Sequence, residues 1–150
     1  MAITWKYHAF DELSSSELYA ILQLRNAVFV LEQHCVYQDA DNKDDQSIHQ
    51  TGWEGNSLAA YCRILPPGLS FKEASIGRVV TSPVSRGVGY GRELMERAVE
   101  FTLSYYNCRR ITIGAQHYLE NFYESIGFVK ISDMYLEDGI PHIEMQLQAK

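Results

Sequence analysis

Three closely spaced glycines, Gly87, Gly89 and Gly91, form the pattern that most clearly indicates chemistry. Glycine places no side chain over the backbone and tolerates positive φ, so successive N–H groups can turn toward one point. A helix expected directly after this loop adds its free N–H groups and the positive end of its dipole. The stretch therefore predicts a phosphate site built mostly from backbone.

The spacing of these glycines separates the classes of phosphate ligand. A nucleotide-hydrolysing Walker loop needs a lysine after its last glycine, and Arg92 stands there instead. A dinucleotide fingerprint, G-x-G-x-x-G, fails because its third glycine would fall on Arg92 or Leu94. The pattern that fits is Arg-x-x-Gly-x-Gly, at Arg86, Gly89 and Gly91. A plain connection between a strand and a helix is the alternative.

The apolar pattern around the loop predicts a mixed α/β chain. Alternation predicts strands over residues 3–8, 47–54, 58–65, 74–81, 110–115, 128–131, 134–136 and 142–147. Helical spacing predicts helices from Ser14 to about residue 29, through residues 94–102, and over residues 118–126. Gly55-Asn56 is typical of a hairpin turn, and Gly127 of a helix end. This order favours one α/β domain over residues 1–150, with a mixed, mostly antiparallel sheet.

Composition narrows the class of protein further. The chain has 150 residues, enough to bury a full core, and a net charge of −6. That charge disfavours nucleic acid and anionic membranes as partners. Cys35, Cys62 and Cys108 are scattered and form no C-x-x-C pair, which favours a reduced, cytoplasmic setting. Residues 1–7 lack the pattern of a signal peptide, and no apolar run is long enough to span a bilayer.

Two motifs together resemble the GNAT superfamily of acetyl-CoA-dependent N-acyltransferases. One is the Arg-x-x-Gly-x-Gly loop at residues 86–91, and the other is residues 121–128, where an aromatic-Tyr pair precedes Gly-Phe. Further segments resemble the ElaA-like branch of the superfamily, namely FVLEQ at 29–33, GRVV at 77–80, AQH at 115–117 and EDGIPH at 137–142. The matches extend from about residue 18 to residue 147.

This resemblance implies a GNAT fold with helices on both faces of the sheet. Two parallel strands, 74–81 and 110–115, would splay apart and hold acetyl-CoA in the opening. The pantetheine arm would pair like an added strand with the backbone of Val79, Val80 and Thr81. The diphosphate would bind the Arg86 side chain and the backbone N–H groups of Gly87, Val88, Gly89, Gly91 and Arg92. As an alternative, Arg86 and Arg92 are simply solvated surface charges.

The resemblance also implies a catalytic role for Tyr123, close to the thioester sulfur. A phenol has an ordinary pKa near ~10, so it stays protonated at neutral pH and can protonate a leaving thiolate. The alternative is a tyrosine that packs under the coenzyme through its ring. Asn121 would hydrogen-bond the pantetheine or adenine side of the coenzyme, or it caps its helix locally.

The general base has no single candidate in the sequence. Strand 74–81, where some GNAT enzymes carry a glutamate, contains no carboxylate. His49 and Glu32 lie in segments that would border the acceptor side, so they are the first candidates. His117 and His142 follow them, because imidazole titrates near neutrality. A water chain, or capture of the neutral fraction of the amine, is equally compatible with the sequence.

Other charged residues have mainly structural explanations. Arg78 lies among apolar neighbours, so we expect it to form an ion pair, with Glu32 as the natural partner; the alternative is a role in the acceptor groove. The acidic run 39–45 is expected to be a solvated loop, or else it attracts a cationic amine. No His and carboxylate pattern has metal-ligand spacing, so no metal is expected.

These inferences favour an enzyme that transfers an acetyl group from acetyl-CoA to a primary amine by direct attack in a ternary complex. The acceptor would be a small molecule or a peptide, and the sequence leaves its identity and the formation of a homodimer open. Two alternatives remain, a CoA-binding sensor without turnover and an interaction domain whose glycine loop is only a turn.

Overall fold

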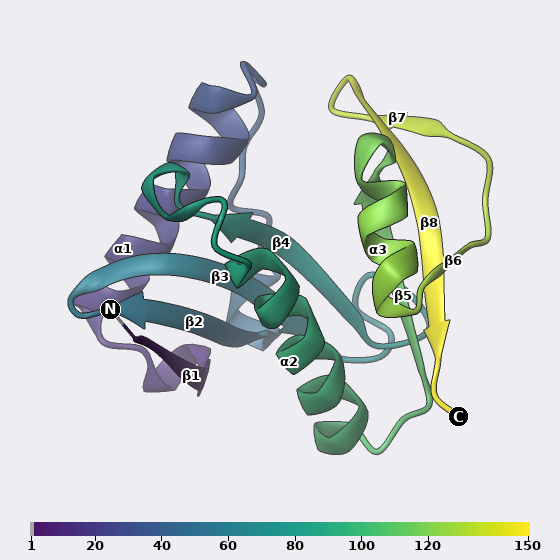
Figure 1. Ribbon diagram of the computed structural model, residues 1–150, viewed down its shortest axis with the longest axis horizontal. Helices are drawn as coiled ribbons and strands as arrows, with labels where there is room; N and C mark the ends of the chain where they lie inside the picture. Colours follow the sequence, from purple (N-terminus) through teal and green to yellow (C-terminus); the bar gives the residue numbers. More distant parts are fainter. Residues whose placement is uncertain (1) are drawn as a thin grey trace.

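Two sheets form the fold, which the computed structural model describes over residues 2–150 (Figure 1). The first sheet has the order β1 (Ile3–Ala9), β2 (Ile48–Glu54), β3 (Ser57–Leu65) and β4 (Ser75–Thr81). The second has the order β5 (Arg110–Gln116), β8 (Ile140–Gln148) and β6 (Val129–Lys130), and β7 (Tyr135–Glu137) also pairs with β8. The helices are α1 (Ser15–Arg25), α2 (Tyr90–Tyr105) and α3 (Glu120–Ile126), and a π-helical segment (Asn26–Glu32) continues α1.

Local sequence signals account for the first half of the fold. The β2–β3 hairpin turns at Gly55-Asn56, which confirms the predicted turn. Ser14 caps α1, because its Oγ accepts from the Glu17 N–H at 3.0 Å while the Glu17 carboxylate accepts from the Ser14 N–H at 2.8 Å. The α geometry ends at Arg25, earlier than predicted, and the chain continues as the π-helical segment. π-Helical segments are rare in proteins, but those that occur often lie at functional sites.

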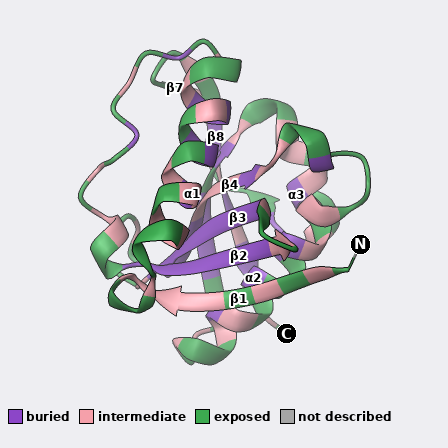
Figure 2. Ribbon diagram, turned by 90° about the vertical axis from the view of Figure 1, so that its left-hand side faces the viewer, coloured by how far each residue is buried: buried purple, intermediate pink, exposed green. Residues whose placement is uncertain are grey.

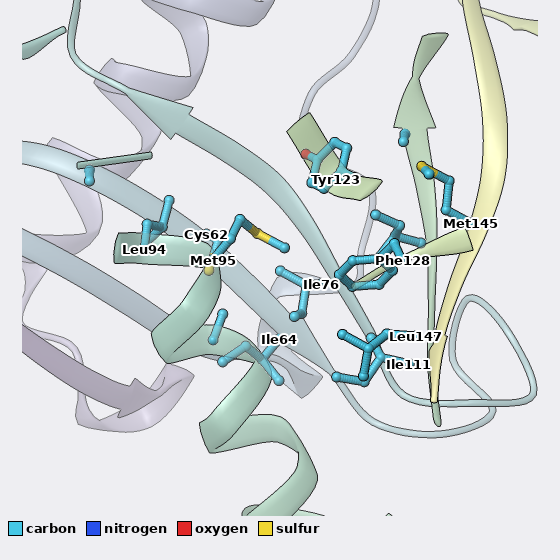
Figure 3. Close-up of a cluster of buried hydrophobic side chains, with 14 of the residues drawn as sticks. Cys62, Ile64, Ile76, Leu94, Met95, Ile111, Tyr123, Phe128, Met145 and Leu147 are labelled. Atoms are coloured by element: carbon cyan, nitrogen blue, oxygen red, sulfur yellow. The ribbon is translucent and has the colours of Figure 1, made fainter. Parts of the chain in front are cut away.

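Helices cover both faces of the first sheet, which confirms that part of the predicted fold (Figure 2). On one face, Leu94 and Met95 of α2 share a buried cluster with Cys62 of β3. On the other face, Ile21 of α1 shares a second cluster with Tyr61. Consecutive strand residues point to opposite faces, so Tyr61 and Cys62 contact different helices. The first cluster continues across β5 and β8, so the two sheets share one core (Figure 3).

The strands β4 and β5 run parallel and then separate, which confirms the expected splayed pair. Within residues 2–150 their one parallel bridge joins Ala74 to Ile111, and the Thr112 N–H donates to the Ala74 carbonyl at 3.0 Å. A β-bulge interrupts the pairing of β4 with β3 at Arg78, whose φ of +50° is unusual within a strand. Bulges bend a strand away from its neighbours. Beyond the bridge, β4 is therefore the edge of its sheet and faces an opening.

The acidic run 39–45 is held in ion pairs, so the expectation of a solvated loop is wrong. Three of its aspartates bind guanidinium groups that are buried or half-buried. The pairs are Arg25–Asp39 at 2.7 Å, Arg25–Asp44 at 2.8 Å, Arg63–Asp44 at 2.9 Å, Arg78–Asp39 at 2.8 Å and Arg63–Asp41. Removing one partner of such a pair leaves a buried charge uncompensated, so the network holds this loop firmly against the first sheet.

We expect this network to make the protein sensitive to acid. Burial alone would raise the pKa of Asp41 and Asp44, but the hydrogen bonds and charges of Arg63 and Arg25 outweigh it and lower both below 3.8. The unfolded chain then binds more protons than the native state at low pH, so stability falls as the pH falls. Urea unfolding should show a steep decrease in the free energy of unfolding as the pH drops below 3.8. A separate decrease should begin below pH 6.5, because burial lowers the pKa of His49 in the native state.

A matched variant tests the origin of that decrease. Asp44→Asn removes one of the paired carboxylates and should flatten part of the acid dependence, whereas Asp45→Asn, at an exposed position of the same loop, should leave it unchanged. Equal profiles for both variants and the wild type would contradict the assignment to the network.

Candidate active site

A cavity of about 1060 Å³ opens where β4 and β5 separate. It extends from the glycine loop, between the two strands, to the turn that joins β7 and β8. Its lining includes Val79, Val80, Thr81, Arg86 and Gly91 on one side, and Gly114, Gln116, Tyr123, Glu137 and His142 on the other. Concave sites of this size, with a few convergent polar groups, are typical of ligand-binding sites.

The glycine loop has the conformation that its sequence predicts. Gly87 and Gly89 have φ values of +86° and +84°, in the region that side chains disfavour, and no atom lies within 4 Å of an added Cβ at either. Gly89 is the N-cap of α2 and has no side-chain cap, so the first N–H groups of the helix are free of a cap. Val88 is exposed, and the Arg92 guanidinium bonds to Ser125. The loop therefore presents open backbone donors at a helix start.

Arg86 is held beside this loop by Glu32 of the π-helical segment. The two groups form a double hydrogen bond at 2.6 and 2.9 Å, and both line the cavity. The prediction that Glu32 pairs with Arg78 is therefore wrong, since Arg78 bonds to Asp39 instead. The hydrogen bond from Arg86 lowers the pKa of Glu32. A carboxylate held in this way is a poor proton acceptor, so its position suits the control of Arg86 better than general base catalysis.

Tyr123 lies in α3 at the wall of the cavity. Its ring packs edge-on against Phe122 and Phe128, with centroids 5.1 and 6.0 Å apart. Its hydroxyl points away from Phe128 and Met145 (Figure 3). Burial raises the pKa of the phenol, so the group keeps its proton at neutral pH and can donate it. Asn121, on the same helix, is exposed and is not part of the cavity lining.

His49, a predicted candidate for the base, lies inside the first sheet and outside the cavity lining. It is fully buried, with Nδ1 2.7 Å from the Tyr61 hydroxyl and Nε2 2.8 Å from the Asp44 carbonyl. Burial lowers its pKa. Both ring nitrogens are occupied, so a structural role fits this position and a proton acceptor does not. His117 is also absent from the lining, whereas His142 belongs to it.

Other lining residues had no signal in the sequence. Phe71 comes from the loop before β4, Tyr37 from the segment before the acidic run, and Tyr135 from β7. Each lies in a segment whose local pattern is that of a loop or a short strand, and only the folding of the chain brings them to one cavity.

Within the described residues 2–150, no three His, Cys, Asp or Glu side chains lie close enough together to hold a metal ion. The helices of this part of the chain are also too short or too polar to cross a membrane.

Comparisons with known proteins agree with this geometry. The family described as acetyltransferase (GNAT) domain matches residues 21–149. Protein ElaA of Escherichia coli K12 is 44% identical over 145 residues, which cover 95% of each chain. The crystal structure of Escherichia coli ElaA superposes with a TM-score of 0.92 at 42% identity, covering 98% of this chain and 100% of the other. An acyl-CoA N-acyltransferase from Pseudomonas aeruginosa has the same TM-score at 40% identity, covering 97% and 99%.

The matched residues include the glycine loop, the splayed strands and Tyr123. Fold, site and sequence similarity thus lead to one conclusion: the chain belongs to the GNAT acetyltransferase family, in the branch that contains ElaA, and such enzymes transfer an acyl group from coenzyme A to an acceptor.

Proposed function

We propose that this protein transfers an acetyl group from acetyl-CoA to a primary amine in a ternary complex. One observation carries the proposal: a single cavity runs from Arg86 and Gly91 of the glycine loop to Tyr123 along the free edge of β4. The other predicted diphosphate residues, Gly87, Val88, Gly89 and Arg92, lie outside its lining. A coenzyme with a diphosphate at one end and a thioester at the other fits that arrangement.

Each part of the coenzyme has a proposed set of contacts. The diphosphate binds the Arg86 side chain and the N–H groups of Gly87, Val88, Gly89, Gly91 and Arg92. The pantetheine arm pairs with Val79, Val80 and Thr81 as an added strand. Asn121 is proposed to reach the pantetheine or the adenine from outside the cavity.

The proposed chemistry uses few side chains. The amine nitrogen attacks the thioester carbonyl, whose oxygen accepts from a backbone N–H near Val79 or Val80. The carbon–sulfur bond then breaks, and Tyr123 gives its proton to the leaving thiolate. No cysteine is needed as an acyl carrier: Cys62 is buried in the core with a raised thiol pKa, and the Cys35 thiol bonds to the Asp138 carbonyl at 3.3 Å.

Two measurements test this function. Millimolar acetyl-CoA should raise the melting temperature, because a ligand that binds only the native state stabilises it by mass action. A panel of small-molecule and peptide amines should then include at least one that drives steady release of CoA thiol. Stabilisation without thiol release would favour a CoA-binding sensor, and the absence of both would favour an interaction domain.

Glu32→Gln is expected to tighten acetyl-CoA binding by a few-fold. In this structure Arg86 is bound to Glu32, and both side chains are 42% exposed, so water screens the pair and it contributes little stability. Without the carboxylate, Arg86 is free to turn to the diphosphate. Calorimetry should show the gain, and Glu96→Gln on exposed α2 surface, which removes the same charge, should not. Weaker binding in Glu32→Gln would mean that Glu32 orients Arg86 for the ligand.

A further inference from the structure

Within the described residues 2–150, His142 is the one histidine that lines the cavity. It lies on β8, opposite Gln116 of β5 on one side and Tyr135 of β7 on the other. Its side chain is 10% exposed, and its ring stacks on Tyr135 with centroids 6.0 Å apart. The ring is therefore fixed in orientation at the end of the cavity away from the glycine loop.

The hydrogen bonds of His142 determine which ring nitrogen carries the proton. Nδ1 lies 2.7 Å from the carbonyl oxygen of Ile140. A carbonyl oxygen can only accept, so Nδ1 must be the donor and carry the hydrogen. In the neutral imidazole, Nε2 then has a free lone pair. This is the tautomer that a proton acceptor at Nε2 requires.

A carboxylate stands next to that lone pair. The Glu137 Oε2 atom lies 3.5 Å from the His142 Nε2 atom. With His142 neutral, both atoms are acceptors and no hydrogen bond joins them. A primary ammonium group has three donors and can bond to both at once. When Nε2 takes a proton, the same carboxylate becomes the counter-ion of the imidazolium.

We propose that His142 is the general base and that Glu137 binds the incoming ammonium and stabilises the imidazolium; this rests on the proposed function. The acceptor arrives as R–NH3⁺, and Nε2 takes one proton from it. The neutral amine attacks the carbonyl carbon, and the carbon–sulfur bond breaks. Tyr123 protonates the thiolate and regains a proton from the nitrogen of the new amide. His142 finally releases its proton to solvent, so one H⁺ leaves per turnover.

The groups around His142 favour a cation at this end of the cavity. Charged and titratable groups that line the cavity near it are Glu137 and Tyr135 on β7, Asp138 in the turn, Glu144 on β8 and Cys35 after the π-helical segment. Gln116 on β5 is uncharged. Glu137, Asp138 and Glu144 lie outside the arginine network of residues 39–45. Within residues 2–150 none of these three carboxylates forms an ion pair with a lysine or an arginine, and Glu137 pairs with His142.

The pH dependence of amine acetylation tests His142. In the wild type, kcat/KM for the amine should depend less on pH than the fraction of free amine in solution does, because the protein itself removes the proton. His142→Gln should lower kcat/KM by about 10²-fold at pH 7. Its remaining rate should keep rising at higher pH as the free amine deprotonates in solution. Affinity for acetyl-CoA and melting temperature should stay close to those of the wild type.

Further variants separate this proposal from folding and from the proposed function. His117→Gln, at a half-exposed histidine outside the cavity lining, should keep the wild-type profile. Glu137→Gln, at a side chain 59% exposed, should fold even if His142→Gln does not, and it should raise KM for a cationic amine several-fold. A wild-type pH profile in His142→Gln, or a wild-type KM in Glu137→Gln, would overturn the proposal. If the wild type released thiol with no amine, the proposed function itself would fail.

Discussion

Tyr123→Phe is expected to lower kcat for amine acetylation by about 10²-fold or more, with an unchanged dissociation constant for acetyl-CoA. Burial raises the pKa of the phenol above 10.0, so the group holds a proton that it can give to the thiolate. Phenylalanine keeps the packing against Phe122 and Phe128 and removes only the donor. Thiol release at saturating amine, together with calorimetric titration of acetyl-CoA, measures the two quantities separately.

A second tyrosine provides the matched control. Tyr118 also lines the cavity, but it is 74% exposed and lies before α3. Tyr118→Phe should change kcat by less than about twofold, because an exposed phenol that water can replace contributes little to proton transfer. A loss of kcat in Tyr118→Phe alone would mean that Tyr118, and not Tyr123, protonates the leaving thiolate. Wild-type kcat in both variants would remove the phenol from the mechanism.

Gly89→Val is expected to raise the dissociation constant for acetyl-CoA by about 100-fold or more, which corresponds to about 2.7 kcal/mol. At a φ of +84°, a side chain costs about 1–2 kcal/mol, so the variant should be less stable but folded. Its isopropyl group would stand over the free N–H groups at the start of α2, where we propose that the diphosphate lies. Calorimetry on protein shown to be folded by circular dichroism measures the effect.

Gly68→Val separates occlusion of the site from backbone strain. Gly68 has a φ of +88° and, like Gly89, no atom within 4 Å of an added Cβ. Gly68 lies in the turn after β3, however, whereas Gly89 is the N-cap of α2. The strain is therefore matched, and acetyl-CoA affinity should remain at the wild-type level. Equal losses of affinity in the two variants would show that strain causes them, and the diphosphate site would then lie elsewhere.

Features that depend on the local backbone could be predicted from the sequence. The glycine loop is one, because a left-handed conformation at Gly87 and Gly89 is a property of each residue type and needs no distant partner. The capped start of α1 at Ser14 and the hairpin turn at Gly55-Asn56 are others. Alternation of apolar residues likewise predicted β4 and β5. That these two strands run parallel and splay apart was implied by the resemblance to the GNAT superfamily.

Features that depend on partners from distant segments could not be predicted in this way. Alternation placed His49 on a strand but did not show that α1 and the acidic loop bury that face. Glu32 could have paired with Arg78 or Arg86, and which arginine it meets depends on how the π-helical segment packs over β4.

His142 shows the same difference between what local sequence and what tertiary contacts determine. Its neighbour Glu137 is only five residues away and directly follows the strand predicted over residues 134–136. Its place in the cavity, however, comes from the pairing of β8 with β5. Local sequence set the φ and ψ angles, the caps and the alternation of this chain. The partners of its charged and polar side chains were decided by tertiary packing. Such residues impose no particular backbone conformation, so no local sequence pattern predicts which distant groups they contact.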